Sequence, residues 1–271
     1  MTSIMQQSQQ QSFSLQDLLV THLDANVHAI RLATGGSSDI VYRDLMLVNG
    51  VRAVIVSTDG LTDPQQLQQF VVDSLTLDHT YDFMNQVPQT LHELPFHELI
   101  RQSILKAGSI EEHSRLDETL DALLSGLAIL LVDGFDRAFA IDVKQYPDRA
   151  ITPSEAETVV RGPRDSFTEN MRTNTALIRR RIKNPDLRIE GHKIGRVTMT
   201  NISIVYIKGI ARHSIVDEVR SRLKRIDIDA MLESGYVEAM IQDNARTTFP
   251  TVYHSERPDV IASTLLEGRI A

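Results

Sequence analysis

Cysteine and tryptophan are both absent from this chain of 271 residues. Without cysteine the protein has no disulfide, no thiolate metal site and no cysteine nucleophile. Aromatic residues make up only 5% of the chain, so stacking surfaces for sugars or single-stranded nucleic acid are scarce. Because 42% of the residues are hydrophobic and 24% are charged, we expect a folded protein of one large or two smaller domains.

Long apolar segments are also missing. The longest, from Gly126 to Asp133, is far shorter than the roughly 20 residues that cross a bilayer, and it is expected to form a buried strand. The first residues, MTSIMQQSQQQSFSLQ, have neither the basic nor the apolar region of a secretory signal. Their Gln- and Ser-rich composition is typical of a disordered leader, which we place at residues 1–13.

Positive charge is scarce overall but concentrated in one segment. The net charge of −8 argues against general nucleic-acid binding. Between Arg161 and Arg196, however, ten Lys or Arg residues stand against four Asp or Glu, while the rest of the chain has 18 basic and 32 acidic residues. This basic segment requires a structural or functional explanation.

The first half of the chain is expected to be an α/β lobe. Helices are expected at residues 14–33, 64–75, 94–105 and 114–125. Strands are expected at residues 40–48, 51–57, 127–132 and 137–143. The pair Asn49-Gly50 between two apolar runs is the strongest short signal for a hairpin. Ser14 is the expected cap of the first helix, and Pro64 suits the first turn of the second.

The second half has a similar pattern after a proline-rich linker between Pro147 and Pro163. Helices are expected at residues 166–183, 214–225 and 229–241, and strands at 187–193 and 196–208. Ser166 and Glu169 have the spacing of a capping box. The final residues, from Leu265 to Ala271, resemble the start of a strand.

These elements predict an α/β fold of two α/β subdomains with mixed sheets flanked by helices, hinged around a cleft. The boundaries are 14–150 for subdomain 1 and 151–271 for subdomain 2. Clefts between lobes are common ligand sites.

Familiar catalytic motifs are not found. The run from His92 to His97 has the spacing H-E-x-x-x-H, one residue too long for a zinc protease, and Pro95 interrupts the helix that such a site needs. The small residues from Ala33 to Asp39 lack the lysine of a phosphate-binding loop and are expected to end a helix. There is no G-x-G-x-x-G and no G-x-S-x-G. We therefore expect no enzyme activity, no metal and no cofactor.

The basic segment provides the candidate ligand-binding residues, in the cleft or at an interface. They are Arg161, Arg164, Arg172, Arg179, Arg180 and Arg181. Three interpretations remain open: a solvated helix with salt bridges, an interface with an acidic partner or with the other lobe, and contact with anionic lipid.

Several ordered phrases resemble the A subunit of the GerA-type spore germination protein family. They begin with Val132-Asp133-Gly134 and Asp148–Pro153, and continue through Arg161–Asn174 (RGPRDSFTENMRTN), Leu177–Pro185 (LIRRRIKNP), Tyr206–Ala211, Asp229–Val237, Phe249-Pro250, Glu256–Asp259 and Leu265–Ile270 (LLEGRI). The resemblance runs from about residue 125 to the end and is weaker before it.

The resemblance implies a function. Such A subunits have a large hydrophilic N-terminal domain followed by a membrane domain, and assemble with B and C subunits in the spore inner membrane. It implies self-association of A subunits, nutrient sensing coupled to ion release, and a membrane domain after residue 271. This soluble domain would face the spore core and contain no catalytic residues.

A second interpretation is a module that binds a small-molecule germinant directly in the cleft between the subdomains, by analogy of fold alone. The resemblance names no residues for such a site, so the arginines given above are its candidates.

Overall fold

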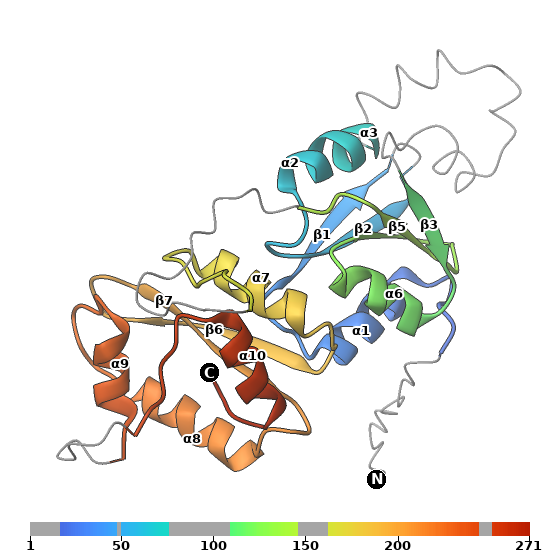
Figure 1. The fold of residues 1–271 in the computed structure, drawn as a ribbon. Coiled ribbons are helices and arrows are strands. Elements are labelled where there is room, and N and C mark those ends of the chain that lie inside the picture. Colours follow the sequence, from blue (N-terminus) through green and yellow to red (C-terminus); the bar gives the residue numbers. More distant parts are fainter. Residues whose placement is uncertain (1–16, 48–49, 76–108, 146–161, 244–250) are drawn as a thin grey trace, which may run out of the picture.

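The computed structural model describes residues 17–47, 50–75, 109–145, 162–243 and 251–271. These residues form two lobes that lie side by side (Figure 1). Lobe 1 contains the described residues from 17 to 145, and lobe 2 contains those from 162 to 271. Each lobe has its own hydrophobic clusters. The leader at 1–13, the helix expected at 94–105 and most of the linker lie outside the described residues.

Lobe 1 is built on a five-stranded sheet with the order β1-β2-β4-β5-β3. Its strands are β1 (Ile40–Met46), β2 (Arg52–Thr58), β3 (Ile110–His113), β4 (Ala128–Val132) and β5 (Ala138–Ile141). The hairpin expected around Asn49-Gly50, β1–β2, is confirmed, and the two strands expected at residues 127–132 and 137–143 pair as a second hairpin, β4–β5. The α/β class is confirmed too. Every described strand pairing is antiparallel, however, whereas we expected mixed sheets.

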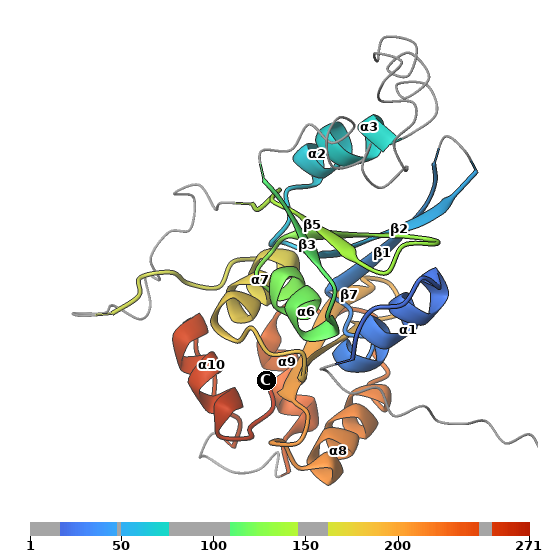
Figure 2. The same cartoon turned by 90° about the vertical axis from the view of Figure 1, so that its right-hand side faces the viewer.

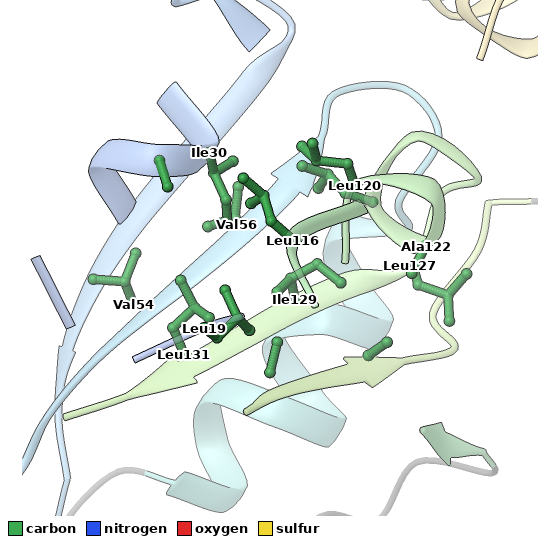
Figure 3. Close-up of a cluster of buried hydrophobic side chains, with 14 of the residues drawn as sticks. Leu19, Ile30, Val54, Val56, Leu116, Leu120, Ala122, Leu127, Ile129 and Leu131 are labelled. Atoms are coloured by element: carbon green, nitrogen blue, oxygen red, sulfur yellow. The ribbon is translucent and has the colours of Figure 1, made fainter. Parts of the chain in front are cut away.

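Helices cover both faces of this sheet (Figures 1 and 2). On one face lie α1 (Leu23–Thr34) and α6 (Leu116–Leu124), which pack against Val54, Val56, Ile129 and Leu131 of the central strands (Figure 3). On the other face lies a continuous helical segment made of α2 (Pro64–Gln66), the π-helical turn η1 (Leu67–Val72) and α3 (Asp73–Leu75). Strands buried on both faces are expected to be almost wholly apolar, as β4 is.

Lobe 2 is a two-stranded antiparallel sheet between two pairs of helices. The strands are β6 (Leu187–Ile194) and β7 (Thr200–Ile207). Helices α7 (Met171–Arg181) and α10 (Pro258–Leu266) cover the face to which the odd-numbered apolar residues of the strands belong. Helices α8 (His213–Lys224) and α9 (Ser234–Ile241) cover the even-numbered face. This alternation follows from the two-residue period of a strand.

Three helices begin later than the sequence suggests, and one of them is α9, which starts at Ser234 instead of residue 229. Helix α1 starts at Leu23, because Leu18 pairs with Arg115 as a β-bridge and the Leu19 N–H donates to the Ser114 carbonyl at 2.8 Å. Helix α7 starts after Asn170, whose side chain accepts from the N–H groups of the first turn. Ser166 does not cap it.

The Ser166 hydroxyl instead donates to the Glu256 carbonyl at 3.0 Å. A tertiary contact therefore overrides the local capping signal at the start of α7. Ser14, the expected cap of the first helix, lies outside the described residues.

The end of the chain is helical where a strand was expected. Residues Leu265 and Leu266 are the last two of α10. Only at Ala271 does the expected strand character appear, because its backbone exchanges two hydrogen bonds with Val205 of β7. The tail thus turns back onto the sheet after Gly268, a glycine with a positive φ of 87°.

Candidate functional site

The two lobes meet where the loop from Ala33 to Asp39 reaches lobe 2. Gly35 ends α1 in the left-handed conformation with φ 62°, and Gly36 follows at 67°. This double turn directs the next residues away from the helix, and leaves Ser37 and Asp39 buried. The sequence predicts the helix stop but not that the loop is the contact surface.

Helix α7 provides the opposing surface. Arg172 and Arg179 are seven residues apart, which places them on one face of a helix, two turns apart, with Ala176 between them. Arg172 contacts Asp59, and Arg179 contacts Asp39. Both aspartates lie at the same end of the β1–β2 hairpin, where the Asp59 N–H donates to the Asp39 carbonyl at 2.7 Å.

Arg179 and Asp39 form a buried ion pair between the lobes. Their side chains are only 1% and 3% exposed. The Arg179 Nε donates to Asp39 Oδ2 at 2.8 Å and its Nη2 donates to Oδ1 at 3.1 Å. The same guanidinium also donates to the carbonyls of Asn184 and Leu187. A buried pair satisfied in this way costs several kcal/mol if one partner alone is removed, because the other charge stays buried.

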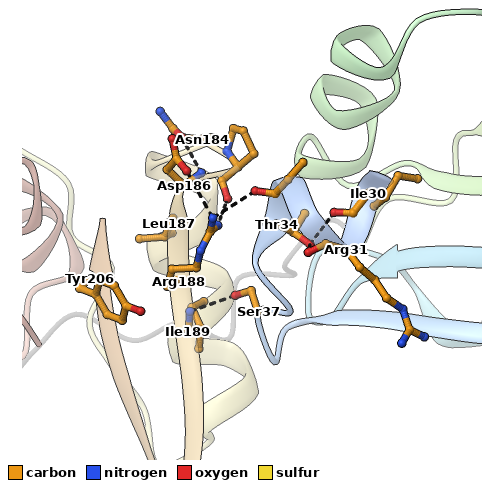
Figure 4. Close-up of polar contacts among 12 residues, drawn as sticks. Ile30, Arg31, Thr34, Ser37, Asn184, Asp186, Leu187, Arg188, Ile189 and Tyr206 are labelled. Atoms are coloured by element: carbon orange, nitrogen blue, oxygen red, sulfur yellow. Dashed lines mark hydrogen bonds and ion pairs between the residues drawn. The ribbon is translucent and has the colours of Figure 1, made fainter. Parts of the chain in front are cut away.

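Backbone hydrogen bonds extend the junction onto the edge of β6. The Ser38 N–H donates to the Ile189 carbonyl at 2.8 Å, and the Ile189 N–H donates to Ser37 Oγ at 2.9 Å (Figure 4). Ser37 Oγ in turn donates to Asp39 Oδ1 at 2.6 Å. One backbone–backbone hydrogen bond and one from a backbone N–H to a side chain therefore join lobe 1 to the outer edge of β6.

Arg188 closes the same side of the junction (Figure 4). Its side chain is 6% exposed, and Nη2 donates to the Ala33 carbonyl at 3.2 Å. Burial lowers the pKa of Arg188 below its usual range. A Cβ on Gly35 would overlap the guanidinium of Arg188, so a larger residue there would have to displace this buried side chain as well as adopt the left-handed backbone angle.

A second, more exposed contact lies near the start of α7. Arg172 pairs with Asp59, and this hydrogen bond raises the pKa of Arg172. The side chain of Arg172 is 55% exposed, so the pair adds little to stability. Beside it, Gly60 lies so close to α7 that a Cβ there would be 2.7 Å from the Ala176 Cβ. The helix and the loop are in direct steric contact.

The sheet of lobe 2 connects this junction to the end of the chain. Ile189, which bonds to lobe 1, is paired with Val205 of β7. Val205 donates to the Ala271 carbonyl at 2.7 Å and accepts from the Ala271 N–H at 2.9 Å. A row of opposed residues therefore runs from lobe 1 through β6 and β7 to the tail, with hydrogen bonds at its two outer steps.

The structure divides the six arginines predicted as ligand-binding. Arg172 and Arg179 join the lobes, and Arg181 pairs with Asp165 inside lobe 2. Arg164 is exposed, and Arg161 lies outside the described residues. Of the open interpretations, contact with the other lobe holds for two arginines. The residues that the prediction missed are Ser37, Asp39, Asp59 and Arg188.

Arg180 differs from its neighbours. It is half-buried, and no hydrogen bond or ion pair of its guanidinium is formed in the structure as described. Burial and the charge of Arg181 both lower the pKa of Arg180.

Two features were sought and not found in the described part of the chain. No group of three or more His, Asp or Glu side chains there is placed to hold a metal ion. None of the helices described is both long enough and apolar enough to cross a membrane.

Comparison with known proteins identifies the family. Residues 28–271 match the family described as "Bacillus/Clostridium GerA spore germination protein". The chain is 36% identical over 256 residues to spore germination protein KA of Bacillus subtilis, covering 94% of this chain and 45% of that protein. It is 34% identical to the membrane protein YfkQ of Bacillus subtilis, covering 92% of this chain and 47% of that protein. The chain thus spans about half the length of the curated relatives it matches.

A solved structure matches almost the whole chain. It is the crystal structure of the N-terminal domain of the A subunit of the Bacillus megaterium spore germinant receptor GerK3, with a TM-score of 0.67 and 38% identity. The match covers 95% of this chain and 92% of that one. The protein therefore belongs to the GerA family of spore germination proteins and corresponds to the N-terminal domain of a germinant receptor A subunit.

Proposed function

We propose that this chain is the coupling domain of a germinant receptor A subunit, acting in nutrient-triggered spore germination. In this proposal it takes part in assembly with B and C subunits and with other A subunits in the spore inner membrane. It passes the nutrient signal to a membrane ion channel in the rest of the protein. Lobe 1 and the tail at Ala271 are the two ends between which the signal would travel.

The buried pair of Arg179 and Asp39 is the observation that carries this proposal. A domain that transmits a change of position has to keep its parts in a fixed relative arrangement. The pair, together with the Ser38–Ile189 hydrogen bond, ties lobe 1 to β6. Arg179 belongs to α7, and α7 packs on α10 through Ile178, Ile182 and Leu265. This packing connects the helix that holds the ion pair to the tail of the chain.

The test is a steric wedge at the junction in the full-length receptor. Gly60→Leu places a side chain against Ala176 of α7, at the contact between the two lobes. The matched control is Gly134→Leu, where φ is also positive, 84° against 75°, and no atom lies within 4 Å of the added Cβ. Spores with either variant are compared for nutrient-triggered germination, and for receptor level by immunoblot.

We expect normal receptor levels in both strains and a germination response lost or strongly slowed only with Gly60→Leu. A normal response with Gly60→Leu at normal receptor level would contradict coupling through the junction.

A second candidate function, binding of a small-molecule germinant, is favoured by Arg180. Among the described residues the half-buried Arg180 guanidinium forms no hydrogen bond or ion pair, and such a group suits the carboxylate of an amino acid. Calorimetric titration of the chain with a panel of amino acids and sugars tests this. Saturable heat that disappears in Arg180→Ala but persists in Arg164→Ala would support binding at Arg180, and the absence of heat would exclude it for those ligands.

A further inference from the structure

The outer edge of β7, the one away from β6, is paired with the tail at only one end in the described structure. Strands in an antiparallel sheet direct the N–H and C=O of alternate residues to opposite edges. Val205 directs both groups to the outer edge, where they bond to Ala271. Asn201 and Ser203 belong to the same alternating set as Val205, so their backbone groups point to the same edge.

No partner for Asn201 or Ser203 on that edge is present among the described residues. Their pairings to β6, with Lys193 and Gly191, are of the type in which the two strands exchange no hydrogen bonds. The opposite edge of the sheet confirms this alternation, because Ile189, paired with Val205, also directs its N–H and C=O away from its partner strand and onto lobe 1.

The tail at Ala271 runs antiparallel to β7, as an additional strand of the sheet would. The two-way exchange between Val205 and Ala271 is the hydrogen-bonded pair of an antiparallel ladder. In that register, residues added after Ala271 run along β7 toward Thr200, and the second of them lies opposite Ser203. The position of Ile270 agrees with this register, since it packs with Ile204 and Tyr206 on the even-numbered face.

We propose that the edge of β7 at Asn201 and Ser203 is a strand-addition site for the residues that follow Ala271 in a longer chain. Such an edge is normally covered, because unpaired backbone groups otherwise recruit other strands. The first and third added residues lie beside Ile204 and Ile202 on the face of α8 and α9, so these two positions select apolar side chains. The second faces α7 and α10.

This inference depends on the hydrogen-bond pattern and not on the proposed function. Curated relatives about twice as long as this chain support the choice of occupant. The third strand formed in this way would extend the rung at Val205 into a continuous ladder.

Amide hydrogen exchange measured by NMR tests the proposal. Chain 1–271 is compared with the same chain extended by the next ten or so residues of its own gene. We expect exchange at Asn201 and Ser203 to slow by about tenfold or more in the extended chain. The Ile189 amide, which bonds to lobe 1 in both, is the internal control and should not change.

A proline placed two residues after Ala271 in the extended chain removes the N–H that would donate to the Ser203 carbonyl. Losing this bond disrupts strand pairing along the edge, so exchange at the Ser203 and Asn201 amides should become fast again. Equal exchange at Asn201 and Ser203 in both chains would overturn the proposal. So would protection that depends on protein concentration, which indicates a second copy at the edge, or a gene that stops after codon 271.

Discussion

The two lobes differ in how they bury their strands. In lobe 1, helices cover both faces of five strands, and every residue of β4 and β5 is buried. In lobe 2 there are two strands, α8 buries only Val216 and Leu223, and α9 buries no residue at all.

Large apolar side chains are left exposed mainly in lobe 2. Nine of those in the described residues belong to lobe 2, namely Val197, Met199, Ile210, Ile215, Leu232, Tyr236, Met240, Tyr253 and Leu266, and five belong to lobe 1. A two-stranded sheet needs packing against helices to be stable, so lobe 2 depends on its four helices and on its contact with lobe 1. The sheet of lobe 1 has five strands and is covered on both faces.

The largest expected effect is the loss of the buried carboxylate. Asp39→Ala leaves the Arg179 charge buried without a partner, and we expect a loss of about 3–5 kcal/mol in the free energy of unfolding. The urea transition should separate into two steps, with lobe 2 unfolding first. The matched control is Asp59→Ala at the exposed pair, which should cost less than about 1 kcal/mol. Equal effects of the two changes would show that the lobes do not depend on the buried pair.

Core truncation compares the lobes directly. Leu123 is 0% exposed in lobe 1 and Leu223 is 7% exposed in lobe 2. We expect Leu123→Ala to cost about 4 kcal/mol and Leu223→Ala about 2 kcal/mol, because the thinner cluster around Leu223 collapses more readily into the space left. Denaturant unfolding of both variants gives the values. A larger cost at Leu223 would reverse our ranking of the two cores.

The close contact between Gly60 and α7 should make even one added methyl group at Gly60 destabilising. Gly60→Ala introduces a Cβ 2.7 Å from that of Ala176 at φ +75°, and is expected to cost about 2 kcal/mol. Gly134→Ala also forces a non-glycine residue into a positive φ, but its Cβ meets no neighbouring atom. This change should cost about 1 kcal/mol. Thermal unfolding of the pair separates the steric part from the backbone part. If both variants melt together, the contact of Gly60 with α7 is not tight.

The smallest effect concerns the clamp that holds α8 on the sheet. Arg220 donates to Glu190 Oε2 at 2.9 Å, and the Tyr206 hydroxyl donates to Oε1 at 2.8 Å. The hydrogen bond from Arg220 is the main cause that lowers the pKa of Glu190, and burial raises the pKa of Tyr206. As pH falls, the Glu190 carboxylate of the unfolded chain therefore becomes protonated at a higher pH than that of the folded chain.

Stability from Glu190 is present above its ordinary pKa near 4.5 and is lost as pH falls through the lower pKa of the folded state. We expect a contribution under about 1 kcal/mol, since the pair is partly exposed to solvent. Unfolding curves of the native chain and Glu190→Gln should converge in acid and separate above about pH 5. A constant difference at all pH values would show that the carboxylate charge is not responsible.

Local patterns predicted most elements, but not the junction. The hairpins β1–β2 and β4–β5 follow from pairs of apolar runs joined by short turns, so residues close in sequence determine them. Of three consecutive arginines, only Arg179 is buried with Asp39, which lies 140 positions earlier in the chain. Which of the three arginines faces lobe 1 depends on how α7 is rotated about its axis, and no local sequence pattern predicts that rotation. The loop from Gly35 to Asp39 was correctly expected to stop a helix, yet its polar residues also bond to the other lobe.

A distance distribution between the lobes tests the central claim most directly. Because the chain contains no cysteine, Asp121→Cys on α6 and Ser221→Cys on α8 give two exposed spin-label sites and no others. We predict one narrow distribution in the otherwise native chain, which becomes broad when Asp39→Ala is added. A broad distribution in the native chain, or one that Asp39→Ala leaves narrow, would contradict a fixed arrangement held by the buried pair.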